Sequence, residues 1–131
     1  MSLNQLYSKK VFKHFRNPKN VGEIKKPDGV ATVGDPVCGD VLRLFIKVSK
    51  KKNGKEFIKE VKFQTLGCAA ALATASVLTE MVKGKRLEEV KKVNNEMVVN
   101  ALGGLPASKI HCSVLAVDAL KKAIENYRKK R

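Results

Sequence analysis

The sequence of 131 residues contains no tryptophan, only three cysteines and few acidic side chains. An odd number of cysteines cannot form a full disulfide framework and is typical of a protein in a reducing compartment. No apolar run approaches the roughly 20 residues that a membrane-spanning helix needs. The stretch from Met1 to Lys10 also lacks the apolar segment of a signal peptide, so we expect a cytoplasmic protein with no membrane partner.

Acidic residues are outnumbered by basic ones, 12 Asp and Glu against 27 Lys and Arg, and the formal net charge is +15. Such a charge is common in nucleic-acid-binding proteins. Here the lysines are spread along the chain, and no aromatic side chains interleave the basic runs at 50–52 and 128–131. We therefore do not expect nucleic acid as a partner. A lysine-rich surface or docking to an acidic protein accounts for the charge equally well.

The hydrophobic pattern changes its period once along the chain. Apolar residues alternate over 41–48 and again over 57–66, and Asn53-Gly54 between them is a hairpin signal, so we predict two long antiparallel strands. A third, short strand is expected near 30–33. Before the strands, helical spacing predicts an N-terminal helix that ends at Asn17-Pro18.

After Gly67 the spacing becomes helical. The predicted helices are an alanine-rich, mostly buried one over 68–82 that Gly84 closes, two short ones near 87–93 and 95–102, and a last one capped by Ser113. The length suits one domain, so residues 1–131 are predicted to form a single domain. The fold class is α+β, a three-stranded antiparallel sheet flanked by an N-terminal helix and several C-terminal helices.

The three cysteines are the candidate functional residues. Cys38 follows a Gly/Pro turn, and Cys68 and Cys112 each stand where a helical pattern begins. A thiol at a helix N-terminus loses its proton more easily, and the thiolate is the form that binds metal. Asp40 and His111 stand beside two of the cysteines and could supply a further ligand. The set favours a soft-metal or iron–sulfur site.

Simpler interpretations exist for each residue taken alone. Any one cysteine could be an inert buried thiol, Asp40 could bind nearby turn amides, and His111 could be a surface or capping residue. The cysteines lie tens of residues apart, which matches no zinc-finger spacing. Adjacent residues such as His111 and Cys112 are also not expected both to point at one atom, although the loop geometry could allow either of them to be used. It is the combination of all five residues that favours a metal site.

An enzyme with Cys112 as nucleophile and His111 as base is a further alternative. Catalytic Cys and His normally come from separate segments, with a third group that orients the base, and no such arrangement is visible. A thiol that accepts sulfur needs only an accessible thiolate. We therefore expect a protein that is not an enzyme.

Several segments together resemble the IscU and NifU N-terminal domain family of iron–sulfur cluster assembly scaffolds. The resemblance covers nearly the whole chain and rests on Tyr7-Ser8, Asn17–Gly22, Cys38-Gly39-Asp40, Gly67-Cys68, Met81–Lys85, Leu105-Pro106 and Lys109–Ser113.

The resemblance implies the fold predicted above and a set of functional roles. Cys38, Cys68 and Cys112 would hold a [2Fe-2S] cluster, with Asp40 or His111 as a labile fourth ligand. Cys112 would accept sulfur from a cysteine desulfurase of the IscS/NifS kind, iron would be bound, and the cluster would pass to apo-proteins. A homodimer is one arrangement open to the cluster-loaded form, and zinc could occupy the resting protein.

The chain departs from the family pattern at one loop. Leu105-Pro106-Ala107-Ser108-Lys109 replaces the Leu-Pro-Pro-Val-Lys of members that use a dedicated DnaK-like chaperone, which argues against that partner here. The alternative function is a zinc-binding, SufU-like sulfur acceptor in which the same residues hold Zn²⁺.

Overall fold

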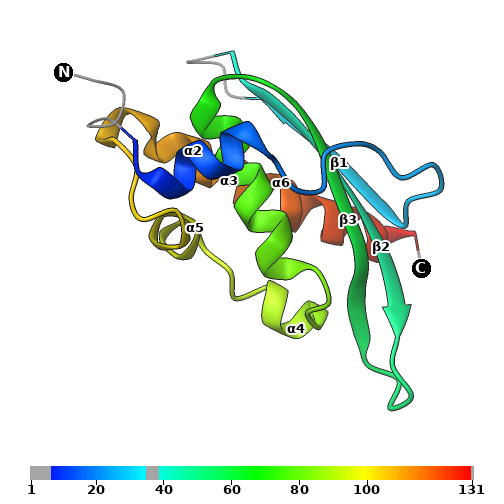
Figure 1. Ribbon diagram of the computed structural model, residues 1–131. Helices are drawn as coiled ribbons and strands as arrows, with labels where there is room; N and C mark the ends of the chain where they lie inside the picture. Colours follow the sequence, from blue (N-terminus) through cyan, green and yellow to red (C-terminus); the bar gives the residue numbers. More distant parts are fainter. Residues whose placement is uncertain (1–6, 35–38, 131) are drawn as a thin grey trace.

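The fold is described here from a computed structural model, which covers residues 7–34 and 39–130 (Figure 1). The elements in chain order are α2 (Lys9–Arg16), β1 (Gly29–Gly34), β2 (Val41–Lys50), β3 (Glu56–Leu66), α3 (Ala69–Val82), α4 (Leu87–Val90), α5 (Asn95–Ala101), the 3-10 helix η1 (Ala107–Lys109) and α6 (Ile110–Lys129). The predicted α+β class is confirmed. The start of the predicted N-terminal helix, residues 1–6, lies outside the described part.

The sheet is an antiparallel meander in the order β1-β2-β3. Its two long strands are joined at the predicted Asn-Gly turn, where Gly54 takes a φ of 82° that residues with a side chain rarely adopt. At the opposite end of the sheet Val41 pairs with both Gly34 and Leu66. The segments that lead into β2 and out of β3 therefore lie side by side.

Helices cover one face of this sheet (Figure 1). The apolar residues that alternate along β2 and β3, among them Leu44, Ile46, Val61 and Phe63, are fully buried against α3 and α6. The contact is closest at Gly29, where an added Cβ would lie 2.2 Å from the carbonyl oxygen of Ala123 in α6. Strand β1 and helix α6 thus touch backbone to backbone.

Helix α3 runs through the centre of the molecule and is anchored at its C-terminal end. Gly84, at a φ of 84°, ends the helix as predicted, and its amide donates to the carbonyl of Ile58 in β3 at 2.7 Å. The amide of Ile58 in turn donates to the carbonyl of Lys85 at 2.9 Å. The end of α3 is therefore tied to the first residues of the edge strand β3.

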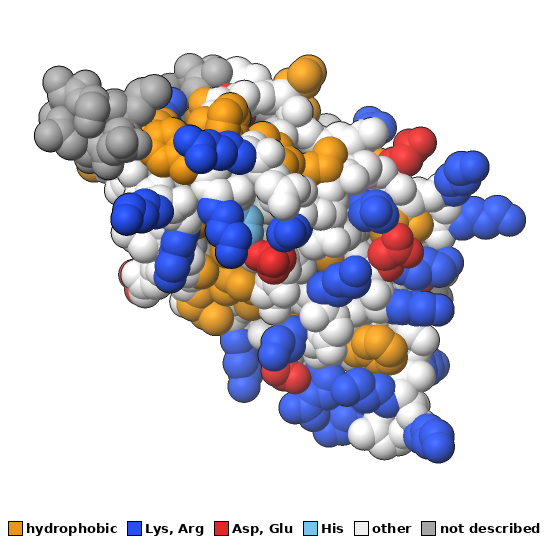
Figure 2. All heavy atoms as spheres, viewed as in Figure 1, with side chains coloured by type: hydrophobic (Ala, Val, Ile, Leu, Met, Phe, Trp, Pro, Cys, Tyr) orange, Lys and Arg blue, Asp and Glu red, His pale blue; other side chains and the backbone are white. Residues whose placement is uncertain are grey.

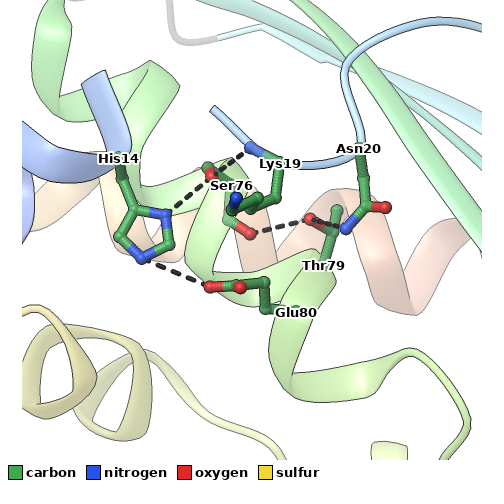
Figure 3. A network of polar contacts seen from close by, with 6 residues as sticks. All are labelled: His14, Lys19, Asn20, Ser76, Thr79 and Glu80. Atoms are coloured by element: carbon green, nitrogen blue, oxygen red, sulfur yellow. Dashed lines mark hydrogen bonds and ion pairs between the residues drawn. The ribbon is translucent and has the colours of Figure 1, made fainter. Parts of the chain in front are cut away.

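A polar network joins α2 to α3 (Figure 3). The imidazole of the buried His14 lies between Ser76 and Glu80, with Nδ1 2.7 Å from the serine Oγ and Nε2 3.4 Å from a glutamate oxygen. The amide of Lys19 donates to the same Oγ at 2.8 Å. The serine hydroxyl can then donate to Nδ1, which leaves the histidine neutral with its Nε2–H toward Glu80.

Three helix boundaries differ from the sequence expectations. Helix α4 stops at Val90, three residues before Val93, and η1 lies within the segment expected to be a loop. Ser113 does not cap α6, because the helix already begins at Ile110 and the Ser113 hydroxyl donates to the Ile110 carbonyl at 2.6 Å. The preceding 3-10 turn moves the helix start towards the N-terminus.

Charge is distributed as expected from the sequence. Lys and Arg side chains are spread over the whole face shown in Figure 2, with few acidic side chains between them. None of the helices in the described ranges is long and apolar enough to cross a membrane.

Candidate metal centre

Three chain segments meet at the end of the sheet where β2 begins and β3 ends. Asp40 directly precedes β2, Cys68 is the N-cap residue of α3, and His111 and Cys112 lie in the first turn of α6. Cys38 belongs to the predicted site but lies outside the described residues. The structure thus brings together four of the five residues singled out in the sequence.

The potential ligand atoms are close to one another. The Sγ atoms of Cys68 and Cys112 are 3.7 Å apart, and Oδ2 of Asp40 lies 3.6 Å and 3.8 Å from them. Nε2 of His111 lies 3.7 Å from the Cys112 sulfur. Ligand atoms of Asp40, His111 and Cys112 all lie within 4.8 Å of one another. Cys68 and Cys112 form no disulfide.

These separations suit tetrahedral coordination. With metal–sulfur bonds of about 2.3 Å, a tetrahedral ion holds two sulfurs roughly 3.8 Å apart, and a sulfur and an oxygen roughly 3.6 Å apart. The distances among Cys68, Cys112 and Asp40 are close to these values. The side chains are therefore already placed as a tetrahedral metal would require.

The expectation that His111 and Cys112 would not point at one atom is wrong. Because η1 leads directly into α6, both residues fall in the first helical turn, and the imidazole bends back toward the sulfur of its neighbour. Either Asp40 or His111 can thus reach a metal held by Cys112.

Helix ends and one lysine make the site electrostatically favourable for anionic ligands. Cys68 and Cys112 lie at the N-termini of α3 and α6, where the helix dipole favours negative charge. The charge of Cys68 raises the pKa of Lys109 above its ordinary value; desolvation opposes this, and Tyr7, Cys112 and Asp40 add to the rise. Lys109 is a neighbour of the site that sequence reasoning did not assign.

Access to the two described sulfurs differs. Cys112 is 1% exposed and packs with Ala70 and Ala71, while Cys68 is only partly buried. Tyr7 and Leu105 pack against this small cluster. Asp40 is 5% exposed, so its carboxyl group is also withdrawn from solvent. A metal ion bound here would add positive charge beside this buried group and the two thiols.

Comparison with known proteins identifies the family of the chain. Residues 6–131 match the family described as NifU-like N terminal domain. IscU 1 of Archaeoglobus fulgidus, named an iron–sulfur cluster assembly scaffold protein, is 55% identical over 125 residues, which are 95% of this chain and 78% of that protein. The scaffold protein IscU of Buchnera aphidicola is 48% identical over 128 residues, or 95% of this chain and 97% of that one.

Solved structures share the fold. A NifU-like N-terminal protein from Brucella abortus superposes with a TM-score of 0.73 at 18% identity and covers 98% of this chain and 99% of its own. An iron–sulfur scaffold for the SUF system from Fervidobacterium islandicum gives 0.69 at 23% identity, over 94% and 99%. The chain belongs to the family of NifU-like N-terminal domains, which includes the IscU proteins.

Proposed function

We propose that this protein is a scaffold on which an iron–sulfur cluster is assembled before transfer to acceptor proteins. Its family membership and the names of its relatives support the proposal. The observation that carries it is the donor set of Asp40, Cys68 and Cys112, held at separations that suit tetrahedral iron, with His111 3.7 Å from the Cys112 sulfur.

The cluster is the cargo of the scaffold. Thiolates of Cys38, Cys68 and Cys112 would hold a [2Fe-2S] cluster, and Asp40 or His111 would complete the set. A carboxylate is a harder donor than a thiolate and holds iron less firmly in a sulfur-rich site. Because this one ligand is bound weakly, a thiol of the acceptor protein can displace it and take the cluster.

Sulfur would arrive from a cysteine desulfurase as a persulfide. The Cys112 thiolate attacks the outer sulfur of the donor persulfide, the donor S–S bond breaks, and the donor leaves as a thiolate while Cys112 becomes the persulfide. The positive charge of Lys109 favours negative charge on the nearby sulfurs, most strongly on Cys68 and less on Cys112. Because Cys112 is 1% exposed, in a cluster against which Tyr7 and Leu105 pack, the site has to open before the donor can reach it.

The proposal assigns partners but no catalytic turnover. The partners are a cysteine desulfurase and apo-proteins that receive the cluster, and a homodimer could hold it between two copies. No dedicated DnaK-like chaperone is proposed, because the loop at 105–109 lacks the second proline that would favour an extended conformation.

Anaerobic reconstitution tests the proposal directly. The protein is purified without oxygen, incubated with ferrous iron, sulfide and a thiol reductant, and then analysed for iron, acid-labile sulfide and visible absorbance. We expect iron and sulfide in equal amounts and a charge-transfer spectrum that is lost in Cys68→Ala and Cys112→Ala variants. Full cluster content in both variants would contradict the three-thiolate site.

A zinc-bound sulfur acceptor of the SufU kind is the second candidate. The spacing of Cys68, Cys112 and Asp40 also suits a single tetrahedral Zn²⁺. Stoichiometric zinc that persists through reconstitution, with no acid-labile sulfide, would favour this function over the scaffold.

A further inference from the structure

Gly67 lies directly against the carboxyl group of Asp40, at the junction of β3 and α3. A Cβ atom added to Gly67 would lie 2.8 Å from both Cγ and Oδ1 of Asp40, and 3.1 Å from Cβ of Ala71. Carbon atoms that are not bonded do not approach to 2.8 Å without strong repulsion. A side chain at position 67 and the observed position of the Asp40 carboxyl group therefore exclude each other.

The backbone at Gly67 does not itself require glycine. Six glycines in the described part of the chain have positive φ angles, and Gly67 is not one of them. A residue with a side chain could adopt its conformation without the strain that a left-handed turn imposes. What glycine provides at this position is space.

That space sets where the carboxyl group of Asp40 lies. Oδ1 faces Gly67, while Oδ2 lies 3.6 Å and 3.8 Å from the sulfurs of Cys68 and Cys112. The group is thus held between the Gly67 backbone and the two thiols, and it is 5% exposed. A methyl group at position 67 would push it away from Gly67, and the sulfurs block the other side.

We propose that Gly67 is a positioning residue for the metal centre, whose missing side chain admits the Asp40 carboxylate to the donor set. The inference rests on the proposed function in taking Asp40 as a metal ligand. With a larger residue at position 67, the centre offers only thiolates and His111 to the metal. Gly67 thereby controls whether a hard oxygen donor takes part.

A double-mutant cycle with Co²⁺ tests this role. Gly67→Ala, Asp40→Ala and the double variant are titrated anaerobically with Co²⁺ alone, whose visible d–d absorption reports the donor set, and their thermal unfolding is recorded. Gly34→Ala is the matched control, because a Cβ there would lie no closer than 3.8 Å to any atom of Asp40.

We expect Gly67→Ala to reproduce the spectrum of Asp40→Ala. Both should change the Co²⁺ affinity by the same factor, because each takes the carboxylate oxygen out of the donor set. The double variant should bind no more weakly than either single variant, and Gly34→Ala should behave like the wild type. Gly67→Ala should also lower the melting temperature less in the Asp40→Ala variant than in the wild type, because Asp40→Ala removes Cγ and Oδ1, the atoms nearest to the added Cβ.

A wild-type Co²⁺ spectrum in Gly67→Ala would overturn the inference. So would effects of the two substitutions on Co²⁺ affinity that add up in the double variant. If Gly67→Ala does not fold, a folded double variant still identifies Asp40 as the obstacle, whereas an unfolded one points to Ala71 and also overturns it. Failure of the wild type to assemble a cluster would instead contradict the proposed function, and the Co²⁺ cycle could still be interpreted.

Discussion

Asp40 combines two properties that rarely occur together in one carboxyl group. It is almost fully buried, and its oxygen lies within 4 Å of two cysteine sulfurs. Among the described residues, the side-chain contacts of Asp40 are to the thiols of Cys68 and Cys112. If Asp40 binds the metal as proposed, it would be the ligand that softer donors can replace.

Replacing Asp40 with alanine should make the assembled cluster longer-lived. Once the hard donor is lost, His111 or an external ligand takes the fourth position, so the cluster still forms but resists chelators and passes more slowly to an acceptor. Decay of the visible absorbance after addition of a chelator measures this. A lifetime equal to or shorter than that of the wild type would contradict the labile-ligand role.

His14 is a second buried residue whose charge state matters. Burial lowers its pKa below the ordinary 6.5, which outweighs the opposite effect of Glu80, and Lys13 and Lys19 lower it slightly further. Protonation would also turn Nδ1 into a donor toward the Ser76 hydroxyl, which already accepts from the amide of Lys19. The network in Figure 3 thus suits the neutral imidazole.

The apo-protein should lose stability in mild acid because of His14. Since its folded-state pKa is lowered, the unfolded chain binds more protons, so the contribution is complete above pH 6.5 and is lost as the pH falls through the folded-state pKa. Melting temperatures between pH 7.5 and 5.5 should fall for the wild type and for His111→Gln, and fall less for His14→Gln. If the melting temperatures of all three proteins fell equally with pH, His14 would not be the residue responsible.

The candidate residues of the site could be found from the sequence, but their packing could not. Local context showed a turn beside Asp40 and a helix start beside Cys68 and Cys112, and the combination of these residues then favoured a metal site. The contact of Gly67 with Asp40 joins two segments distant in sequence and depends on the register of β2 with β3. The role of Lys109 likewise depends on where α6 begins relative to Cys68.

At the scale of elements, alternation and turn chemistry specified the sheet well. The Asn-Gly turn and the buried alternation fixed the two long strands to within two residues of their observed ends. The start of α6 was misplaced because a 3-10 turn has no strong sequence signal and Ser113 resembles a capping residue. Local patterns determine which elements exist, and packing determines where they end.

The contact of β1 with α6 should be the most sensitive point between elements. Gly29→Ala would place its methyl group 2.2 Å from a carbonyl oxygen of α6, so the helix must shift and we expect a loss of about 3 kcal/mol in the free energy of unfolding. Gly34→Ala in the same strand is the control and should change little. Chemical denaturation measures both, and equal losses would show that the close approach is not what matters.

On the scale of the whole molecule, a metal at the proposed centre would add a cross-link between segments that the β2–β3 ladder and a hydrogen bond from Thr74 to the Cys112 carbonyl already join. The described ligands come from the segment before β2 and from the first turns of two helices. A metal bound to all of them cross-links elements that separate on unfolding. Metal loading should therefore act on global stability as well as on the site.

Zinc binding should raise the melting temperature of the apo-protein. A ligand at 100 times its Kd that binds only the folded state adds about 2.7 kcal/mol, or roughly 10 °C for a domain of this size. Chelation with EDTA should reverse the rise, and Cys112→Ala should abolish most of it. An equal rise in Cys112→Ala would place the zinc elsewhere, for example on surface residues.

The backbone bonds between Gly84, Lys85 and Ile58 have a consequence for local opening. They hold the C-terminal end of α3 to the sheet, whereas the N-terminal end carries Cys68 and depends on the state of the centre. Amide hydrogen exchange should therefore be slow near Ile58 and Gly84 with or without metal, and should slow on metal loading only in the first turn of α3. Helix α3 would then open only at its N-terminal end, so that a cluster could leave while the C-terminal end of α3 stays hydrogen-bonded to β3.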